Sequence, residues 1–270
     1  MSIGLRRFLY FTAACTGACI LVVEILGAKM LSPFLGTSHF VWTAQIAVTL
    51  VALSGGYYAG GWLVDQSPNL NRLYYGILAS AVYLAATVPM VKPLCLNLMS
   101  LPLAWATLLA ALFLFLVPLA LLAMTGPFLV RLLTQSIQNV GLNVGRLSAI
   151  STLGSVAGTV LIGYVLIPRF PNSVTMLITS GILIALAAVY LIVWGRGAGG
   201  NVLMLALGLS LGFGYSGLRG QFGDTMKYSG VNWEVLYRAN SNYGELQVIE
   251  YRNGAVVERR YLNDQLVQNT

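Results

Sequence analysis

Long stretches of apolar residues dominate this chain and restrict what it can fold into. A helix needs about 20 apolar residues to cross the hydrocarbon core of a bilayer, and six stretches meet that length. A seventh, from Asn201 to about Tyr215, is shorter and rich in glycine, so it crosses, tilts or lies at the interface. The sequence therefore predicts an all-α polytopic membrane protein of about seven transmembrane helices. The six longer stretches are roughly residues 8–31, 41–63, 73–93, 101–124, 147–168 and 173–195.

Composition agrees with a membrane protein. Of the 270 residues, 57% are hydrophobic and only 9% are charged, whereas a soluble domain carries about 25% charged residues. The formal net charge is +7, but no basic cluster alternates with aromatic residues on a polar face, so no nucleic-acid partner is predicted. Arg6 and Arg7 precede the first apolar stretch as in a signal peptide, but the stretch exceeds the usual apolar region of about 7–15 residues. We therefore expect a retained membrane helix.

Basic residues between the apolar stretches predict the orientation of the chain. If each stretch crosses, successive loops lie alternately on the two sides of the membrane. Lys92 and Arg169 then lie on one side, and a larger group of basic residues lies on the other. Because cytoplasmic loops carry more Lys and Arg, the N-terminus is predicted to be cytoplasmic, in a bacterial inner membrane. The C-terminal tail lies outside if the seventh stretch crosses and is cytoplasmic if it does not. The larger group is Arg6, Arg7, Arg72, Arg131, Arg146 and Arg196.

The first apolar stretch contains two ionisable residues, Glu24 and Lys29. An ionisable group at bilayer depth costs about 2.5–3.5 kcal/mol on insertion scales and marks a functional site by default. Lys29 is near the end of the stretch, so its long side chain can reach the interface. Glu24 is deeper, which leaves two interpretations. It is either a structural glutamate hydrogen-bonded between helices or a binding group for a cation or an amine.

Two glycine-rich segments predict close helix packing. Gly56 and Gly60 in the second stretch, and Gly154 and Gly158 in the fifth, have the GxxxG spacing that lets helix backbones approach. Before each glycine-rich helix, a preceding stretch ends in a similar sequence, Met-Leu-Ser-Pro-Phe-Leu at 30–35 and Met-Thr-Gly-Pro-Phe-Leu at 124–129. The match predicts two three-helix repeats of opposite topology, as in many transporters, plus one helix. Because the match is short, a chance similarity is the alternative.

The tail differs in character from the rest, which divides the chain into a transmembrane domain, 1–216, and a small soluble domain, 217–270. Residues 243–251 alternate between polar and apolar side chains, Asn253-Gly254 suits a hairpin turn, and residues 255–262 form the predicted return strand. So small a β-hairpin module has too few apolar side chains to be stable alone. We expect it to pack on the membrane domain or on another chain.

Several of these motifs together resemble the membrane half of fused spermidine-synthase-like proteins. That half is related to the major facilitator transporters, so the resemblance implies a transporter-like helical fold. Residues 61–65, Gly-Trp-Leu-Val-Asp, are similar to the Gly-x-x-x-Asp of the transporters' loop between helices two and three, although Gln66-Ser67-Pro68 replaces the basic residues that follow there. The resemblance rests on Glu24, residues 31–38, Trp42, residues 53–61, Asp65, and residues 126–131 and 145–159.

The tail is similar to the N-terminal β-hairpin module of polyamine aminopropyltransferases, over residues 241–250 and 261–268. In that family a Tyr-Gln pair and a Leu-Asp-Gly…Gln run help to bind the aminopropyl donor and the polyamine. The resemblance therefore implies polyamine-binding roles for Tyr243, Asp264 and Gln268. Gly244 stands where the family has the Gln of the pair, and Asn263-Asp264 replaces Asp-Gly.

Residues for catalysis are not apparent. Aminopropyl transfer needs a Gly-rich turn after a strand to bind the nucleotide and a carboxylate to deprotonate the amine, and the sequence ends at Thr270 where that domain would begin. We expect no aminopropyltransferase activity from this chain alone. His39 is the only histidine, so no metal site and no cofactor are predicted.

Two hypotheses for the function remain. The first is a catalytically incomplete, spermidine-synthase-like membrane anchor or subunit whose hairpin docks a partner, either a synthase-like chain or a second copy in a homo-oligomer. The second is a small polyamine or cation transporter that uses Glu24. In both, the lipid bilayer surrounds the helices.

Overall fold

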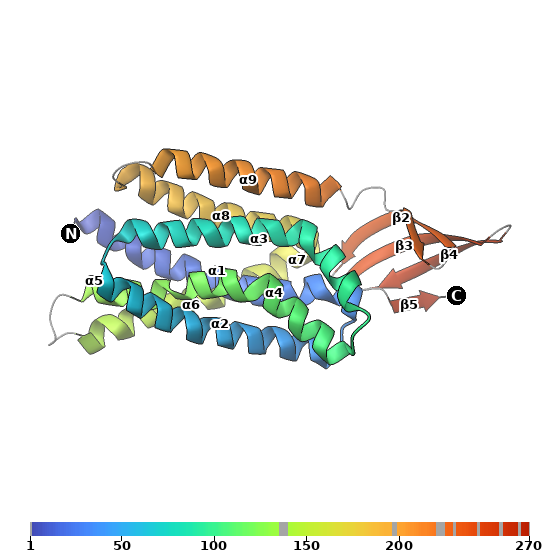
Figure 1. The fold of residues 1–270 in the computed structure, drawn as a ribbon, viewed down its shortest axis with the longest axis horizontal. Coiled ribbons are helices and arrows are strands. Elements are labelled where there is room, and N and C mark those ends of the chain that lie inside the picture. Colours follow the sequence, from blue (N-terminus) through green and yellow to red (C-terminus); the bar gives the residue numbers. More distant parts are fainter. Residues whose placement is uncertain are drawn as a thin grey trace.

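A computed structural model gives the fold as a bundle of long helices with a sheet at one end (Figure 1). The helices are α1 (Ile3–Leu35), α2 (His39–Gln66), α3 (Leu70–Leu98), α4 (Leu103–Ala123), α5 (Thr125–Leu133), α6 (Val140–Leu161), the π-helical turn η2 (Ile162–Leu166), α7 (Ile167–Arg169), α8 (Asn172–Val193) and α9 (Gly199–Arg219). The structure describes residues 2–134, 140–195, 199–219, 225–228, 231–241, 244–253, 256–263 and 266–269.

Seven helical segments of the described chain are long and apolar enough to cross a membrane, which confirms the predicted α-helical membrane architecture. Two of them are composite. α4 and α5 together cover residues 103–133, and α6, η2 and α7 together cover residues 140–169. Most of the helices extend beyond the predicted apolar stretch, because helical hydrogen bonding continues into the polar flanks.

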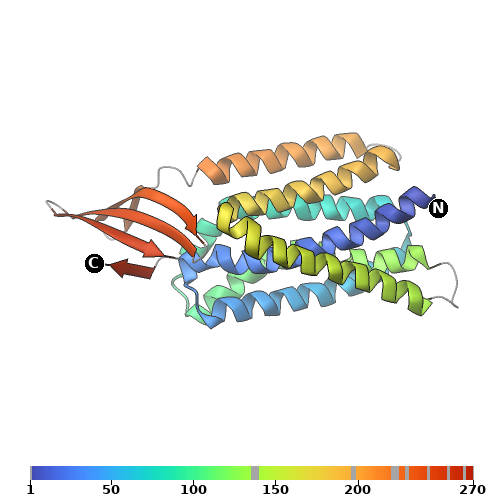
Figure 2. The same ribbon diagram turned by 180° about the vertical axis from the view of Figure 1, so that it is seen from behind.

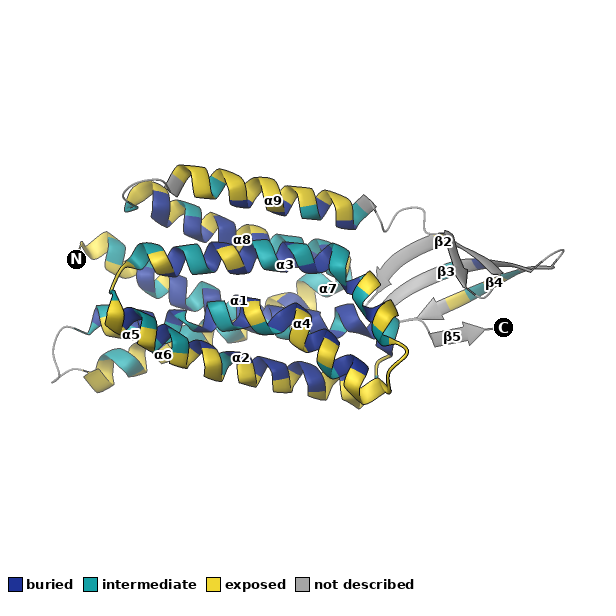
Figure 3. Ribbon diagram, viewed as in Figure 1, coloured by how far each residue is buried: buried dark blue, intermediate teal, exposed yellow. Residues whose placement is uncertain are grey.

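The bundle buries apolar side chains between its helices and leaves others on its outer surface (Figure 3). α2 packs against α4, α6 against α1, and α3 against α4, α8 and α9. α1 has buried residues along most of its length, while α6 and α9 expose apolar side chains such as Leu153, Met204 and Leu211. Exposed apolar surface on spanning helices is what contact with lipid requires.

The two similar sequences around Pro33 and Pro127 take different structures. α1 continues through Pro33 to Leu35 and ends at Gly36, whose positive φ of 79° suits a residue without a side chain. At the second sequence the helix is interrupted at Met124 and resumes as α5. The expectation that both sequences end a helix therefore holds at Gly36, whereas Pro127 lies in the first turn of the next helix, where proline is tolerated.

The tail forms an antiparallel meander with strand order β1-β2-β3-β4-β5. Register within it changes between Val235 and Tyr237 of β2 and between Tyr261 and Leu262 of β4. The strands are β1 (Thr225–Tyr228), β2 (Val231–Ser241), β3 (Gly244–Asn253), β4 (Val256–Asn263) and β5 (Leu266–Asn269).

The two ends of the chain lie at opposite ends of the bundle (Figure 2). α9 packs against α3 and α8 and runs from the end where α1 begins to the end where the sheet lies. α9 is long and apolar enough to cross, which favours the predicted alternative in which the tail lies on the side of the membrane opposite to the N-terminus.

Candidate functional site

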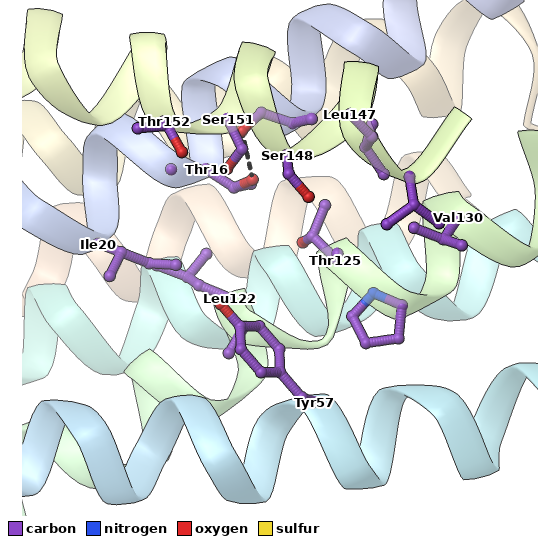
Figure 4. A pocket seen from close by; sticks show the side chains of 16 residues that line it. Thr16, Ile20, Tyr57, Leu122, Thr125, Val130, Leu147, Ser148, Ser151 and Thr152 are labelled. Atoms are coloured by element: carbon purple, nitrogen blue, oxygen red, sulfur yellow. Dashed lines mark hydrogen bonds between the residues drawn. The ribbon is translucent and has the colours of Figure 1, made fainter. Parts of the chain in front are cut away.

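A cavity of about 460 Å³ lies between α1, α2, α4, α5 and α6 (Figure 4). Its volume falls in the range of small-molecule sites, about 300–1,000 Å³. No carboxylate or basic side chain lines it, and its polar groups are hydroxyls. The lining residues that carry hydroxyls are Thr16, Tyr57, Thr125, Ser148, Ser151 and Thr152.

α1 and α6 approach so closely at the cavity that a side chain on Gly17 has no room. A Cβ at Gly17 would lie 2.6 Å from the Ser151 Oγ. Farther along the same contact, a Cβ at Gly158 would lie 2.8 Å from the carbonyl oxygen of Ala18, and Gly154 is in similar contact with Ala14. The glycines at 154 and 158 therefore lie where α6 meets α1.

Gly56 and Gly60 lie between α2 and α4 as Gly154 and Gly158 lie between α6 and α1. A Cβ at Gly60 would lie 2.7 Å from the Cα atom of Met124, and one at Gly56 would lie 2.6 Å from the Cβ of Ala123. Both glycines thus bring α2 against the residues where α4 ends. Small residues are needed for such close contact in membranes.

The break between α4 and α5 forms one wall of the cavity. Thr125, Gly126, Pro127 and Val130 of α5 all line it, as does Ala123 at the end of α4. The hydrogen bonds that cross this region are Met124 N–H to the carbonyl of Ala120, at 3.2 Å, and Phe128 N–H to the carbonyl of Met124, also at 3.2 Å. The break leaves backbone groups without the helical hydrogen bonds that a continuous helix would give them.

Glu24 lies beside the cavity, one turn beyond its lining. Ala13, Gly17 and Ile20 of α1 line the cavity, and Glu24 follows them at a spacing that keeps all four within about 60° of one another around the helix. Long side chains on a helix tend to point toward its N-terminus, which for Glu24 is the direction of Ile20. Glu24 is partly buried and has no hydrogen bond or ion pair with any described residue.

Gln45 is a second polar group without a partner. It is fully buried, and both its Nε2 and its Oε1 lack a hydrogen bond within the described chain. The amide lies flat against Gly27, where a Cβ would be 2.7 Å from Nε2. Gln45 is not part of the cavity lining, and the close contact with Gly27 leaves no room for a ligand there.

An ion pair joins α2 to α5 at the N-terminal end of the bundle. Arg131 Nε donates to Asp65 Oδ1 at 3.3 Å, and the two side chains are 65% and 72% exposed. Asp65 is the last residue of the Gly-x-x-x-Asp motif. It and Arg131 both carry the resemblance to spermidine-synthase-like proteins, and the two are in contact. Lys29 lies in the C-terminal half of α1. Its carbonyl accepts a hydrogen bond from Asn172 Nδ2 at 3.3 Å.

The structure does not test the polyamine-binding roles that the resemblance implies for residues of the tail. Tyr243 and Asp264 lie outside the described residues, and Gln268 is described only as backbone of β5. Sequence reasoning missed Thr125, Ser148 and Ser151. The spacing of Ser148, Ser151 and Thr152 on one helical face was a signal that could have indicated them.

The chain gave no match to a protein family, to a curated protein or to a solved structure.

Proposed function

We propose that the helical bundle binds a small organic cation, such as a polyamine, in the cavity and carries it across the membrane with Glu24 as the charge partner. The observation that carries this proposal is the position of Glu24. It is the only carboxylate within the membrane-spanning part away from the helix ends, and it lies on the cavity-lining face of α1 without a partner.

Electrostatics favour a cationic ligand over a neutral or anionic one. A carboxylate surrounded by apolar helices is costly when nothing pairs with it, and an ammonium group offsets that cost. Because Glu24 is two turns from Gly17, it lies about 10 Å farther along α1. A flexible linear amine spans such a distance, with one nitrogen at Glu24 and the rest of the molecule among the cavity hydroxyls.

The arrangement of the helices supports a transporter built from inverted repeats. In the proposed repeats, α1, α2 and α3 correspond to α4–α5, α6–α7 and α8. The contact of α2 with α4 then corresponds to the contact of α6 with α1, and both contacts contain a GxxxG pair. Such exchange of partners is what a pseudo-twofold axis in the membrane plane produces, and binding sites lie at the repeat interface.

Uptake into proteoliposomes tests the proposal. Vesicles that contain the purified chain should accumulate radiolabelled spermidine or putrescine, and Glu24→Gln should reduce uptake at least tenfold. Glu258→Gln is the matched control, since Glu258 lies in the tail, where it accepts hydrogen bonds from Arg260. Equal uptake by Glu24→Gln and Glu258→Gln would remove Glu24 from the mechanism and contradict the proposal.

We propose a second function for the tail, namely docking of a partner chain by strand addition, in keeping with the resemblance to spermidine-synthase-like proteins. The supporting observation is the sheet order, which leaves β1 and β5 as edges of the meander. Edge strands offer unpaired backbone groups to another strand. The exposed apolar side chains of Leu236 and Tyr261, 44% and 59% exposed, are available for contact with the partner.

Cross-linking tests the docking function. A photoreactive residue at Val267 of β5 should yield a cross-linked product in native membranes, and its mass identifies a synthase-like chain or a second copy. The same residue at Tyr58 of α2, which is 80% exposed on the bundle surface, is the control. A Val267 variant that cross-links to no protein would contradict the docking function.

A further inference from the structure

The carbonyl oxygen of Ala123 lacks the hydrogen bond that a continuous helix would give it. Four residues later stands Pro127, which has no N–H group. No backbone or side-chain donor of the described chain replaces it. Ala123 is one of the residues that line the cavity.

Thr125 adds a second unpartnered oxygen. Its side chain is 2% exposed, and its Oγ1 has no hydrogen-bond partner within the described chain. Hydroxyls on other spanning helices differ. Thr16, Ser32 and Thr49 each donate to the carbonyl four residues earlier at 2.8–2.9 Å. A buried hydroxyl without a partner costs about 1–3 kcal/mol, so an exception of this kind calls for a bound group.

α6 supplies further oxygens from the opposite wall. The hydroxyls of Ser148 and Ser151 have no hydrogen bond to any described residue, and both line the same cavity. Figure 4 shows the side chains of Thr125 and Ser148 directed into the cavity from their two helices. Hydroxyls of Thr125 on α5 and of Ser148 and Ser151 on α6 therefore border one cavity, with Ser148 exposed and Ser151 partly buried.

We propose that this break is a binding site for a monovalent alkali-metal cation, held by the carbonyl of Ala123 and the hydroxyls of Thr125, Ser148 and Ser151. Hard cations take oxygen ligands, and interrupted membrane helices bind sodium with their freed carbonyls. Divalent cations in proteins are held mainly with carboxylates, and no lining residue carries one. The site therefore suits a single positive charge.

The cation site goes beyond the proposed carriage of an amine and uses other residues. Glu24 is one turn past Ile20, about 12 Å along α1 from Thr16. A cation at the break and an ammonium group near Glu24, which lies beyond the cavity lining, would therefore use different ligands. Sodium binding at the break would then couple the movement of the amine to the sodium gradient.

Binding of radioactive sodium to the purified full-length chain in detergent tests the site. The unmodified chain should show saturable binding, and Thr125→Val should weaken it at least tenfold. Thr125→Ser, which keeps the hydroxyl, should restore binding. Thr159→Val is the matched control, because the Thr159 hydroxyl donates to the carbonyl of Ser155 at 2.9 Å and does not line the cavity.

Three results would overturn the proposal. They are no saturable sodium binding by the unmodified chain, equal binding by Thr125→Val and Thr159→Val, and displacement of sodium by choline as efficient as displacement by unlabelled sodium. If Thr125→Val does not elute as a folded protein in size-exclusion chromatography, Ser148→Ala replaces it with the same expected loss. Sodium binding that survives Glu24→Gln while amine uptake is lost would support the cation site as separate from the amine site. Amine uptake that survives Thr125→Val would contradict the coupling of amine movement to sodium.

Discussion

Pro33 and Pro127 each begin a Pro-Phe-Leu sequence, and each leaves the carbonyl four residues earlier without its helical donor. The surroundings of the two carbonyls differ. At Pro33 the freed carbonyl belongs to Lys29, and Asn172 of α8 donates to it at 3.3 Å. At Pro127 the freed carbonyl belongs to Ala123, and no described residue donates to it. The first helix continues without interruption, and the second breaks beside a cavity. Each proline therefore frees a carbonyl, and the presence of a neighbouring donor distinguishes the structural position at Pro33 from the position at Pro127 that is open to a ligand.

Exchange of each proline for alanine is the strongest way to break this comparison. Pro127→Ala restores an N–H group that can bond the Ala123 carbonyl, which should join α4 to α5 and reduce sodium binding and amine uptake to background. Pro33→Ala should leave both activities within about twofold, because α1 is already continuous and a twofold change corresponds to only about 0.4 kcal/mol. Uptake measured side by side for the two variants checks this. Equal losses would show that the two prolines have the same role.

A side chain at Gly60 should distort the break from the α2 side. A Cβ there would lie 2.7 Å from the Met124 carbonyl oxygen, so Gly60→Val should lower stability by about 1–3 kcal/mol through overpacking. Gly55→Val is the control on the same helix, because nothing lies within 4 Å of a Cβ at Gly55. Thermal unfolding in detergent measures both variants, and similar midpoints would contradict the tight contact.

The hydrogen bond from Asn172 to the Lys29 carbonyl can be tested as compensation for Pro33. Asn172→Ala removes the hydrogen bond from Asn172 to the Lys29 carbonyl and should cost about 1–2 kcal/mol. In a Pro33→Ala background the same change should cost little, because the new N–H of residue 33 serves that carbonyl. The four unfolding midpoints form a double-mutant cycle, and purely additive effects would show that Asn172 does not compensate for Pro33.

The smallest effect is expected at the far end of α5. The Asp65–Arg131 pair is exposed on both sides, so Arg131→Gln should change stability by less than about 1 kcal/mol, and salt should reduce the difference further. Unfolding midpoints at low and high ionic strength measure it. A larger, salt-independent loss would indicate that the pair holds α5 in place beside the cavity.

The spanning helices could be predicted from sequence because lipid requires each one to be apolar over its own length, a property local to the chain. Thr125 shows the limit of such reasoning. Most helical hydroxyls bond to their own backbone, and only the break at Met124 makes this one available. Pro127 indicated an interruption, but the sequence did not indicate that the helix would resume at once as α5, beside Gly60 of α2. Glu24 was recognisable by its charge, whereas its place next to the cavity depends on the neighbouring helices.

The path of α9 has a consequence for how the chain enters the membrane. With α9 crossing, the tail and its six basic residues lie on the side that also holds Lys92 and Arg169, opposite the six basic residues of the other side. Loops as short as this tail contribute to the choice of orientation. Over the finished protein, eight basic residues on the tail side stand against six on the other side, so the tail reverses the excess that the loops alone show. We therefore expect the first helix, with Arg6 and Arg7 at its start, to set the orientation before the tail is made. The basic residues of the tail are Arg219, Lys227, Arg238, Arg252, Arg259 and Arg260.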